Sequence, residues 1–226
     1  MKNKMTIEIW SDIVCPFCYI GKRRFEAALA QFEHKEYIEV IWKSFQLVPN
    51  HDSRKAISLQ EVLMAKGFSA EKAKTLNEQA TLMAEHVGLT YRLDQAKYVN
   101  TFNAHRFIHF AKQVEKQEEA EECLFAAYFT HGKNIDDTDS LLELGQAIGL
   151  VTLQLSEALA NDSFYDEVRT DIYEAQQLGI SAVPFFVLNR KYGISGAQAP
   201  ETFLKNMQIA FEEWRKENPL TSQEII

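Results

Sequence analysis

Cysteine is scarce in this chain of 226 residues, which contains only three. Proteins that rely on structural disulfides carry more cysteines in shorter chains, so a disulfide framework is excluded. No stretch of the sequence approaches the roughly 18 consecutive apolar residues of a membrane span. The opening residues, MKNKMTIEIW, lack the apolar run of a signal peptide. We therefore expect a cytoplasmic protein with no membrane partner.

Positive charge is also in deficit, with 24 Lys and Arg against 32 Asp and Glu and a formal net charge of −8. Nucleic-acid binding requires clustered Lys and Arg that contact phosphates, so no nucleic-acid partner is expected. The sequence lacks fixed-period repeats and low-complexity linkers. Its 46% hydrophobic residues can bury a substantial core, and its length suits one domain that carries a sizeable insertion.

The order of the predicted elements places a helical block inside an α/β unit. Residues 5–10 alternate between apolar and polar types, as a strand does, and a helix follows until about Gln31. A second strand is predicted over 37–47, and nearly every segment from 58 to 178 has helical periodicity. Two short strands and a last helix, about 200–216, close the chain.

The predicted fold class is therefore α/β, with the order β-α-β … β-β-α and a large all-α insertion. Residues 1–50 and 179–217 form one discontinuous domain, 51–178 form the inserted helical domain, and 218–226 form a C-terminal tail. Helices of the insertion are expected to start at a capping box of Ser58 and Glu61 and at N-caps Asn100 and Ser163. The charge run EKQEEAEE (115–122) is expected to be a solvated helix face.

Two of the three cysteines, Cys15 and Cys18, lie three residues apart where the first strand gives way to a helix. Pro16 falls at the first helical position, where its missing N–H has no cost. The helix N-terminus favours a thiolate at Cys15, and a thiolate is the species that attacks a disulfide. Cys18, one turn on, is expected to be buried and protonated and to attack the resulting mixed disulfide.

A zinc site and a purely structural role are the alternatives for this cysteine pair. Zinc needs about two further Cys or His ligands at workable spacing. The nearest histidines, His34 and His51, are separated from the pair by an entire helix. No metal is therefore predicted, and Cys123, in the middle of a helix, is expected to be a small buried apolar residue.

Several strings of the sequence together resemble a known family. They are SDIVCPFCYIG, FQLVP (45–49), NTFNAHR (100–106), GISAVPFFV (179–187) and ISGAQ (194–198). With the helical block, they look like the DsbA-like branch of the thioredoxin superfamily, and most closely its FrnE-like members. The resemblance implies a thioredoxin-like fold and a cis peptide bond before Pro184, which would lie beside the cysteines. The backbone of Val183 would then be free to pair with an extended substrate segment.

The same resemblance suggests further site residues. Pro16 and Phe17 would contact substrate, with Phe17 as an aromatic lip beside Cys15. His105 and Arg106 belong to the inserted helices that cover the active site in this family, and they could line the cleft. A histidine among Phe102, Phe107 and Phe110 is more often a packed residue, which is the alternative for His105. Asp12 could relay the proton of Cys18 or accept backbone hydrogen bonds in the strand-to-helix turn.

Three functions follow as candidates. The first is a cytoplasmic thiol–disulfide oxidoreductase or isomerase that acts on protein or peptide disulfides through a reversible Cys15–Cys18 couple. It needs no cofactor beyond this couple, and glutathione is a candidate reductant. The second is a glutathione-dependent transferase or isomerase, related to the kappa-class and 2-hydroxychromene-2-carboxylate isomerase branch. The third is a non-enzymatic module that senses redox state or acts like a chaperone.

Overall fold

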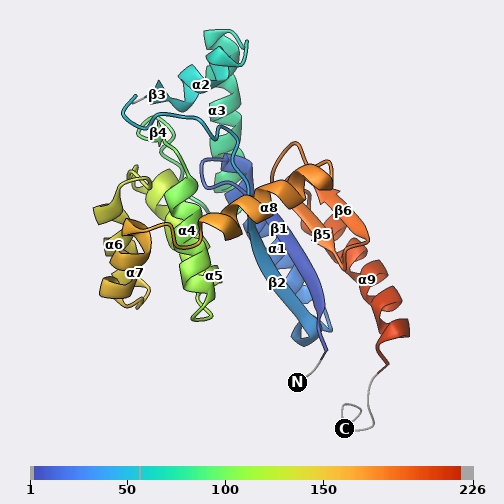
Figure 1. Ribbon diagram of the computed structural model, residues 1–226. Helices are drawn as coiled ribbons and strands as arrows, with labels where there is room; N and C mark the ends of the chain where they lie inside the picture. Colours follow the sequence, from blue (N-terminus) through green and yellow to red (C-terminus); the bar gives the residue numbers. More distant parts are fainter. Residues whose placement is uncertain (1–2, 56, 220–226) are drawn as a thin grey trace.

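The computed structural model of this protein describes residues 3–55 and 57–219, and its centre is a mixed four-stranded sheet (Figure 1). The strand order is β2-β1-β5-β6; β1 and β2 are parallel, and the other neighbours are antiparallel. The strands are β1 (Met5–Ser11), β2 (Ile38–Ser44), β5 (Phe185–Leu188) and β6 (Tyr192–Ser195). Strands from both ends of the chain thus share one sheet, which confirms the predicted order of elements.

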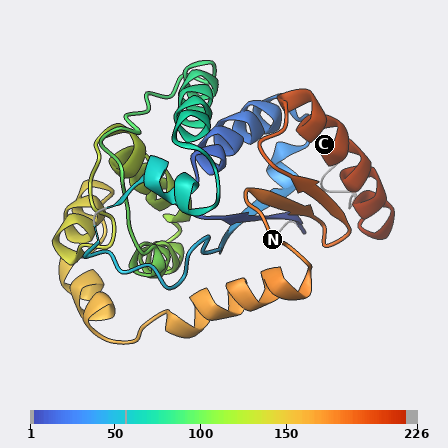
Figure 2. The ribbon, with the colours of Figure 1, turned by 90° about the horizontal axis from the view of Figure 1, so that it is seen from above.

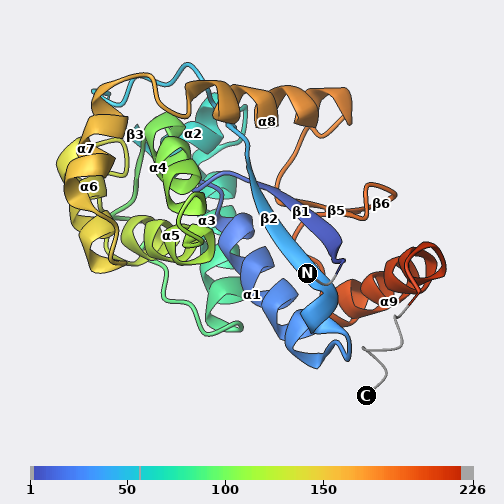
Figure 3. The same cartoon turned by 60° about the horizontal axis from the view of Figure 1, so that its bottom comes forward.

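Helices cover both faces of this sheet (Figures 2 and 3). On one side, α1 (Pro16–Gln31) and α9 (Pro200–Glu217) pack against each other. Met5, Ile7 and Ile9 of β1 are buried in the core that these two helices close. On the other side lies α8 (Tyr165–Gln177), and Trp10 donates its indole N–H to the carbonyl of Asp171 there. The period-two alternation of β1 therefore assigns its two faces to two different cores.

The insertion between β2 and β5 is helical, apart from one short pair of strands, β3 (Ile57–Ser58) and β4 (Lys97–Tyr98). A π-helical turn, Ala126–Thr130, follows α5. Besides α8, the insertion contains the helices α2 (Leu59–Ala65), α3 (Ala70–Glu85), α4 (Phe102–Lys112), α5 (Gln117–Phe125), α6 (Thr138–Ala147) and α7 (Thr152–Ala160). Most of the predicted tail, from residue 220 on, lies outside the described residues.

The predicted helix starts have mixed outcomes. The capping box of Ser58 and Glu61 is present, with both reciprocal hydrogen bonds. Ser163 is not an N-cap: α8 begins after Phe164, whose backbone is left-handed with φ 62°, and the Ser163 carbonyl accepts a hydrogen bond from Arg106 instead. Asn100 lies one residue before the N-cap of α4, although its side chain accepts the N–H of Phe102. Tertiary contacts decide these ends, which local sequence does not encode.

The charge run 115–122 is only partly a solvated face, because it forms the junction between α5 and α1. Lys22 of α1 is buried, and its ammonium contacts the carboxylates of Glu26, Glu118 and Glu122. Glu122 also accepts hydrogen bonds from Arg23 at 2.9 Å and from the Tyr19 hydroxyl at 2.6 Å. This network fixes the inserted helices to the helix that begins at Cys15.

Acid should weaken this junction. Burial alone would raise the pKa of Glu122, but hydrogen bonds from Arg23 and Tyr19 and the charge of Lys22 lower it to about 2. A depressed folded-state pKa contributes stability that is complete above the ordinary value of 4.5 and is lost as pH falls toward 2. Urea unfolding at a series of pH values between 4.5 and 2 should show the free energy of unfolding falling more steeply with decreasing pH in the native protein than in Glu122→Gln. Equal slopes would contradict this assignment.

Candidate active site

Cys15 and Cys18 meet at the turn between β1 and α1. Cys15 is the N-cap of α1, with an extended backbone, and Pro16 occupies the first helical position as predicted. The Cys15 N–H donates to the carbonyl of Asp12 at 2.9 Å, and the Cys18 N–H donates to the carbonyl of Cys15 at 3.0 Å. These two hydrogen bonds hold both cysteines in the first turn of the helix.

The two thiols are free and buried, Cys15 at 5% exposure and Cys18 at 1%. Burial, followed by a hydrogen bond with Cys15, raises the pKa of Cys18 well above its ordinary value. Cys18 is therefore a protonated thiol in the reduced protein, as the sequence predicted. The structure brings the two side chains into contact, which a reversible disulfide between them requires.

The segment before β5 closes over Cys15. The peptide bond between Val183 and Pro184 is cis, as the family resemblance implied. The Cys15 thiol donates to the carbonyl of Val183, with Sγ and the oxygen 3.4 Å apart. Val183 and Pro184 are buried, whereas Ser181 and Ala182, just before them, are exposed. Access to Cys15 from solvent therefore passes this short segment.

Gly21 is a site residue that the sequence reasoning missed. A Cβ atom built on Gly21 would lie only 2.9 Å from Cγ of Pro184, so a larger residue would push α1 and this proline apart. A glycine inside an amphipathic helix costs about 1 kcal/mol relative to alanine. A glycine inside a helix despite this cost was the only sequence signal for Gly21, and the close packing against Pro184 explains why a glycine is needed there.

Asp12 lies in the turn between β1 and α1, three residues before Cys15, and is buried. Its backbone carbonyl accepts the Cys15 N–H, and its Oδ2 accepts the N–H of Leu47 at 2.7 Å. Its Oδ1 is buried and has no hydrogen-bond partner among the described residues. The role in the turn is therefore visible directly, and the role in proton transfer stays a prediction.

His105 does not line an open cleft, so the structure corrects its assignment as a substrate-binding residue and agrees with the alternative of a packed histidine. Its side chain is 1% exposed, and its Nε2 lies 2.8 Å from the carbonyl oxygen of Phe45 and 3.7 Å from Oδ1 of Asp12. Arg106 is also buried, and its guanidinium donates to backbone carbonyls near the end of α7. Both side chains pack the interior of the insertion, so neither can touch a substrate in this conformation.

Phe17 is the large apolar side chain exposed beside the cysteines, at 40%, and Pro16 is half-buried. Tyr91 of the insertion holds this turn from behind, since its hydroxyl donates to the carbonyl of Pro16 at 2.6 Å. The Tyr91 ring stacks on Phe129, with centroids 4.6 Å apart. No sequence signal connects Tyr91 to Pro16, 75 residues away.

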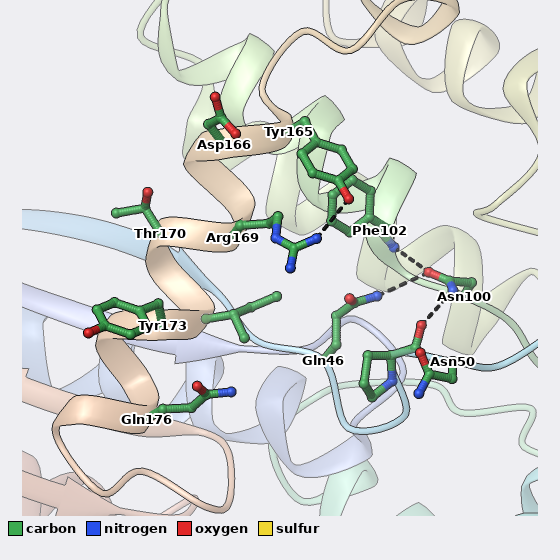
Figure 4. Close-up of a pocket in the computed structure, with 12 residues that line it drawn as sticks. Gln46, Asn50, Asn100, Phe102, Tyr165, Asp166, Arg169, Thr170, Tyr173 and Gln176 are labelled. Carbon is green, nitrogen blue, oxygen red and sulfur yellow. Dashed lines mark hydrogen bonds between the residues drawn. The ribbon is translucent and has the colours of Figure 1, made fainter.

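A separate groove of about 770 Å³ runs between α8 and the loop that follows β2 (Figure 4). Tyr165, Arg169 and Tyr173 line it from α8, and Gln46 and Asn100 line it from the other side. Cys15, Cys18 and Pro184 are not among its lining residues. The groove therefore neighbours the loop whose Leu47 N–H binds Asp12 but does not contain the sulfurs of Cys15 and Cys18.

Within residues 3–55 and 57–219, no group of three or more His, Cys, Asp or Glu side chains is placed to hold a metal ion. None of the helices in these ranges combines the length and apolar character that crossing a bilayer requires.

Cys123 is partly buried, and burial, followed by the charges of Glu121 and Glu122, raises its pKa to about 12.

Comparisons with known proteins agree with this geometry. The model of a family described as DSBA-like thioredoxin domain matches residues 6–208. The uncharacterized protein YwbO of Bacillus subtilis (strain 168) is 30% identical over 203 residues, 88% of this chain and 94% of that protein. A probable DsbA oxidoreductase from Streptomyces coelicolor has a TM-score of 0.88 at 39% identity, with 96% of this chain and 93% of that chain covered.

A more distant structure shares the fold. The cytosolic disulfide reductase DsbM from Pseudomonas aeruginosa has a TM-score of 0.66 at 15% identity and covers 92% of this chain and 99% of its own. At this identity the likeness is one of architecture alone. The matched fold includes both the central sheet, with the helix that begins after Cys15, and the helical insertion.

Proposed function

Because the chain belongs to the DsbA-like thioredoxin domain family of thiol–disulfide oxidoreductases, we propose that it exchanges disulfides with protein or peptide substrates through Cys15 and Cys18. One observation carries the proposal: two free thiols share the first turn of α1, and one of them contacts the carbonyl of Val183. A thiol pair at a helix N-terminus suits nucleophilic attack on sulfur.

The proposed reaction has two exchange steps. The Cys15 thiolate attacks a substrate disulfide, forms a mixed disulfide and releases the first substrate thiolate. Cys18 then attacks Sγ of Cys15, which forms the Cys15–Cys18 disulfide and releases the second substrate thiolate. The substrate gains two electrons and the protein loses two, and the Cys18 proton passes to the free oxygen of Asp12. In the reverse direction the same steps oxidise a dithiol.

The substrate segment is proposed to lie along Val183 and Phe17. The Val183 backbone would pair with an extended chain, and the exposed ring of Phe17, with Pro16, would contact apolar substrate side chains. We place the protein in the cytoplasm with glutathione as the thiol that reduces Cys15–Cys18. A cytosolic disulfide reductase from Pseudomonas aeruginosa shares this architecture, which is compatible with this placement. Membership of the FrnE-like branch stays a prediction.

Peptide mapping and insulin reduction test this function together. The oxidised protein should contain a Cys15–Cys18 disulfide and a free Cys123 thiol, and catalytic amounts should accelerate insulin reduction by glutathione. Equilibration in glutathione buffers of graded ratio gives the reduction potential of the couple. A Cys123→Ala variant should match the native protein in all three measurements. No acceleration over glutathione alone, or oxidation that involves Cys123 instead, would refute the proposal.

A further inference from the structure

The hydroxyl of Tyr91 reaches the active-site turn from the helical insertion. It donates to the carbonyl oxygen of Pro16, and the two oxygens are 2.6 Å apart. The side chain of Tyr91 is buried, at 7% exposure. Burial, and then the charges of Cys15 and Cys18, raise the pKa of Tyr91 well above its ordinary value. Tyr91 therefore keeps its proton and stays a hydrogen-bond donor to this turn.

The loop that carries Tyr91 is fixed on both sides by the π-helical turn after α5. The Thr130 hydroxyl donates to the carbonyl of Thr90 at 2.8 Å. The Arg92 N–H donates to the carbonyl of Phe129 at 2.7 Å, and the Phe129 ring stacks on that of Tyr91. Single π-turns next to α-helices occur frequently at functional sites. The Tyr91 hydroxyl is thus a preorganised dipole, held in place before any reaction begins.

The Pro16 carbonyl belongs to the same peptide unit as the N–H of Phe17. Cys15 is the N-cap of α1, and the side chain of an N-cap residue accepts from the N–H of the second or third helical residue. The third of these N–H groups, that of Cys18, donates to the carbonyl of Cys15 at 3.0 Å. The second, that of Phe17, is therefore the donor left for the sulfur of Cys15.

Ionisation of Cys15 changes the hydrogen bonds that its sulfur can make. The neutral thiol donates to the carbonyl of Val183, with Sγ and the oxygen 3.4 Å apart. A thiolate has no proton to donate and is repelled by that oxygen, so its stabilising partner is the N–H of Phe17. A hydrogen bond at the carbonyl end of a peptide unit polarises the unit and strengthens the donor at its other end. The contact of Tyr91 with Pro16 therefore favours the thiolate over the thiol.

We propose that Tyr91 is a positioning residue that stabilises the Cys15 thiolate through the peptide unit between Pro16 and Phe17. Its hydroxyl acts on the Pro16 carbonyl, and the Phe17 N–H transmits the effect to the sulfur. The helical insertion thereby sets the reactivity of the first cysteine and the balance between dithiol and disulfide. For its role in catalysis this inference rests on the proposed function, but the thiolate itself can be measured without any substrate.

Tyr91→Phe removes the hydroxyl and keeps the stacked ring. Alkylation of the reduced protein by iodoacetamide at a series of pH values, with Cys15 located by peptide mapping, measures the thiolate. The pH of half-maximal alkylation should rise by about half a unit, which corresponds to an about threefold loss of thiolate below that pH. Above it, equilibrium with glutathione should shift about threefold toward the Cys15–Cys18 disulfide, because the dithiol form has lost stabilisation of its thiolate.

Tyr19→Phe is the matched control. The Tyr19 hydroxyl also donates over 2.6 Å, but to Glu122 on α5, and its ring belongs to the same stack, with its centroid 6.2 Å from that of Tyr91. Each variant thus loses one hydroxyl hydrogen bond from this cluster, and the thermal midpoint of unfolding should fall in both. The pH profile of Cys15 and the glutathione equilibrium should change in Tyr91→Phe alone.

The result that would overturn the inference is a Tyr91→Phe protein whose pH profile and glutathione equilibrium match those of the native protein. Equal shifts in Tyr91→Phe and Tyr19→Phe would overturn it as well, since they would assign the effect to loosening of the aromatic stack. A different result bears on the proposed function alone. If Tyr91→Phe shows the expected shift but the native protein does not accelerate insulin reduction, the proposed function is refuted and the role of Tyr91 is supported.

Discussion

A Cys15→Ser variant should lose insulin reduction by roughly three orders of magnitude or more, because a serine hydroxyl is not ionised at neutral pH and does not attack disulfides. It should also form no mixed disulfide. A Cys18→Ser variant should lose turnover to a similar extent for a different reason. Cys15, at the N-cap of α1, still attacks the substrate, but no buried thiol remains to resolve the product.

Mass spectrometry of the intact proteins distinguishes these outcomes. After one addition of a peptide disulfide, Cys18→Ser should accumulate as a covalent adduct at Cys15, and Cys15→Ser should stay unmodified there. Cys123→Ser controls for unrelated thiol chemistry and should keep native turnover. Cys18→Ser that continues to turn over with glutathione would support the glutathione-dependent transferase or isomerase. Cys15→Ser that keeps native activity would exclude the dithiol mechanism.

Gly21→Val should impair both stability and catalysis. The position beside Pro184 has no room for a Cβ atom, and valine adds two further methyl groups. Overpacking of this kind costs about 1–3 kcal/mol. It should also displace Pro184 and Val183 from Cys15, and misplacement of about 1 Å near reacting atoms can lower a rate on the order of a hundredfold.

Ala27→Val is the matched control for this substitution. Ala27 lies on the exposed side of the same helix, so the valine side chain creates no close contact there. Valine lowers helix propensity at Ala27 but raises it at Gly21, so a larger loss of stability in Gly21→Val can be assigned to packing. Urea unfolding and single-turnover attack on a peptide disulfide should both be impaired in Gly21→Val and near native in Ala27→Val. A Gly21→Val protein with native rates would show that α1 and Pro184 can separate without consequence.

Features with a local physical signature could be predicted from the sequence. The alternation of Met5, Ile7 and Ile9 places these side chains in one core, and the spacing of Cys15 and Cys18 places both thiols at the start of α1. Both depend on neighbours within one turn or one strand. The cis bond before Pro184 came from the family resemblance and has no local signature.

Features that depend on distant packing could not be predicted. His105 is buried because the loop after β2 passes over it and the Phe45 carbonyl contacts its ring. Glu121 lies in a run of charged residues typical of a solvated face, and only the docking of α5 on α1 makes that position internal. Tyr91 likewise acquires its partner through the tertiary fold. Each of these contacts joins segments dozens of residues apart in the chain.

The pairing of β1 with β5 also determines when the protein can fold during synthesis. Ile7 opposes Leu188, so the second residue of each such pair leaves the ribosome long after the first. Cys15 emerges early, whereas the segment that covers it is translated near the end. Until then the nascent chain carries an uncovered reactive thiol, and a ribosome that stalls before β5 would leave that thiol open to other cellular disulfides.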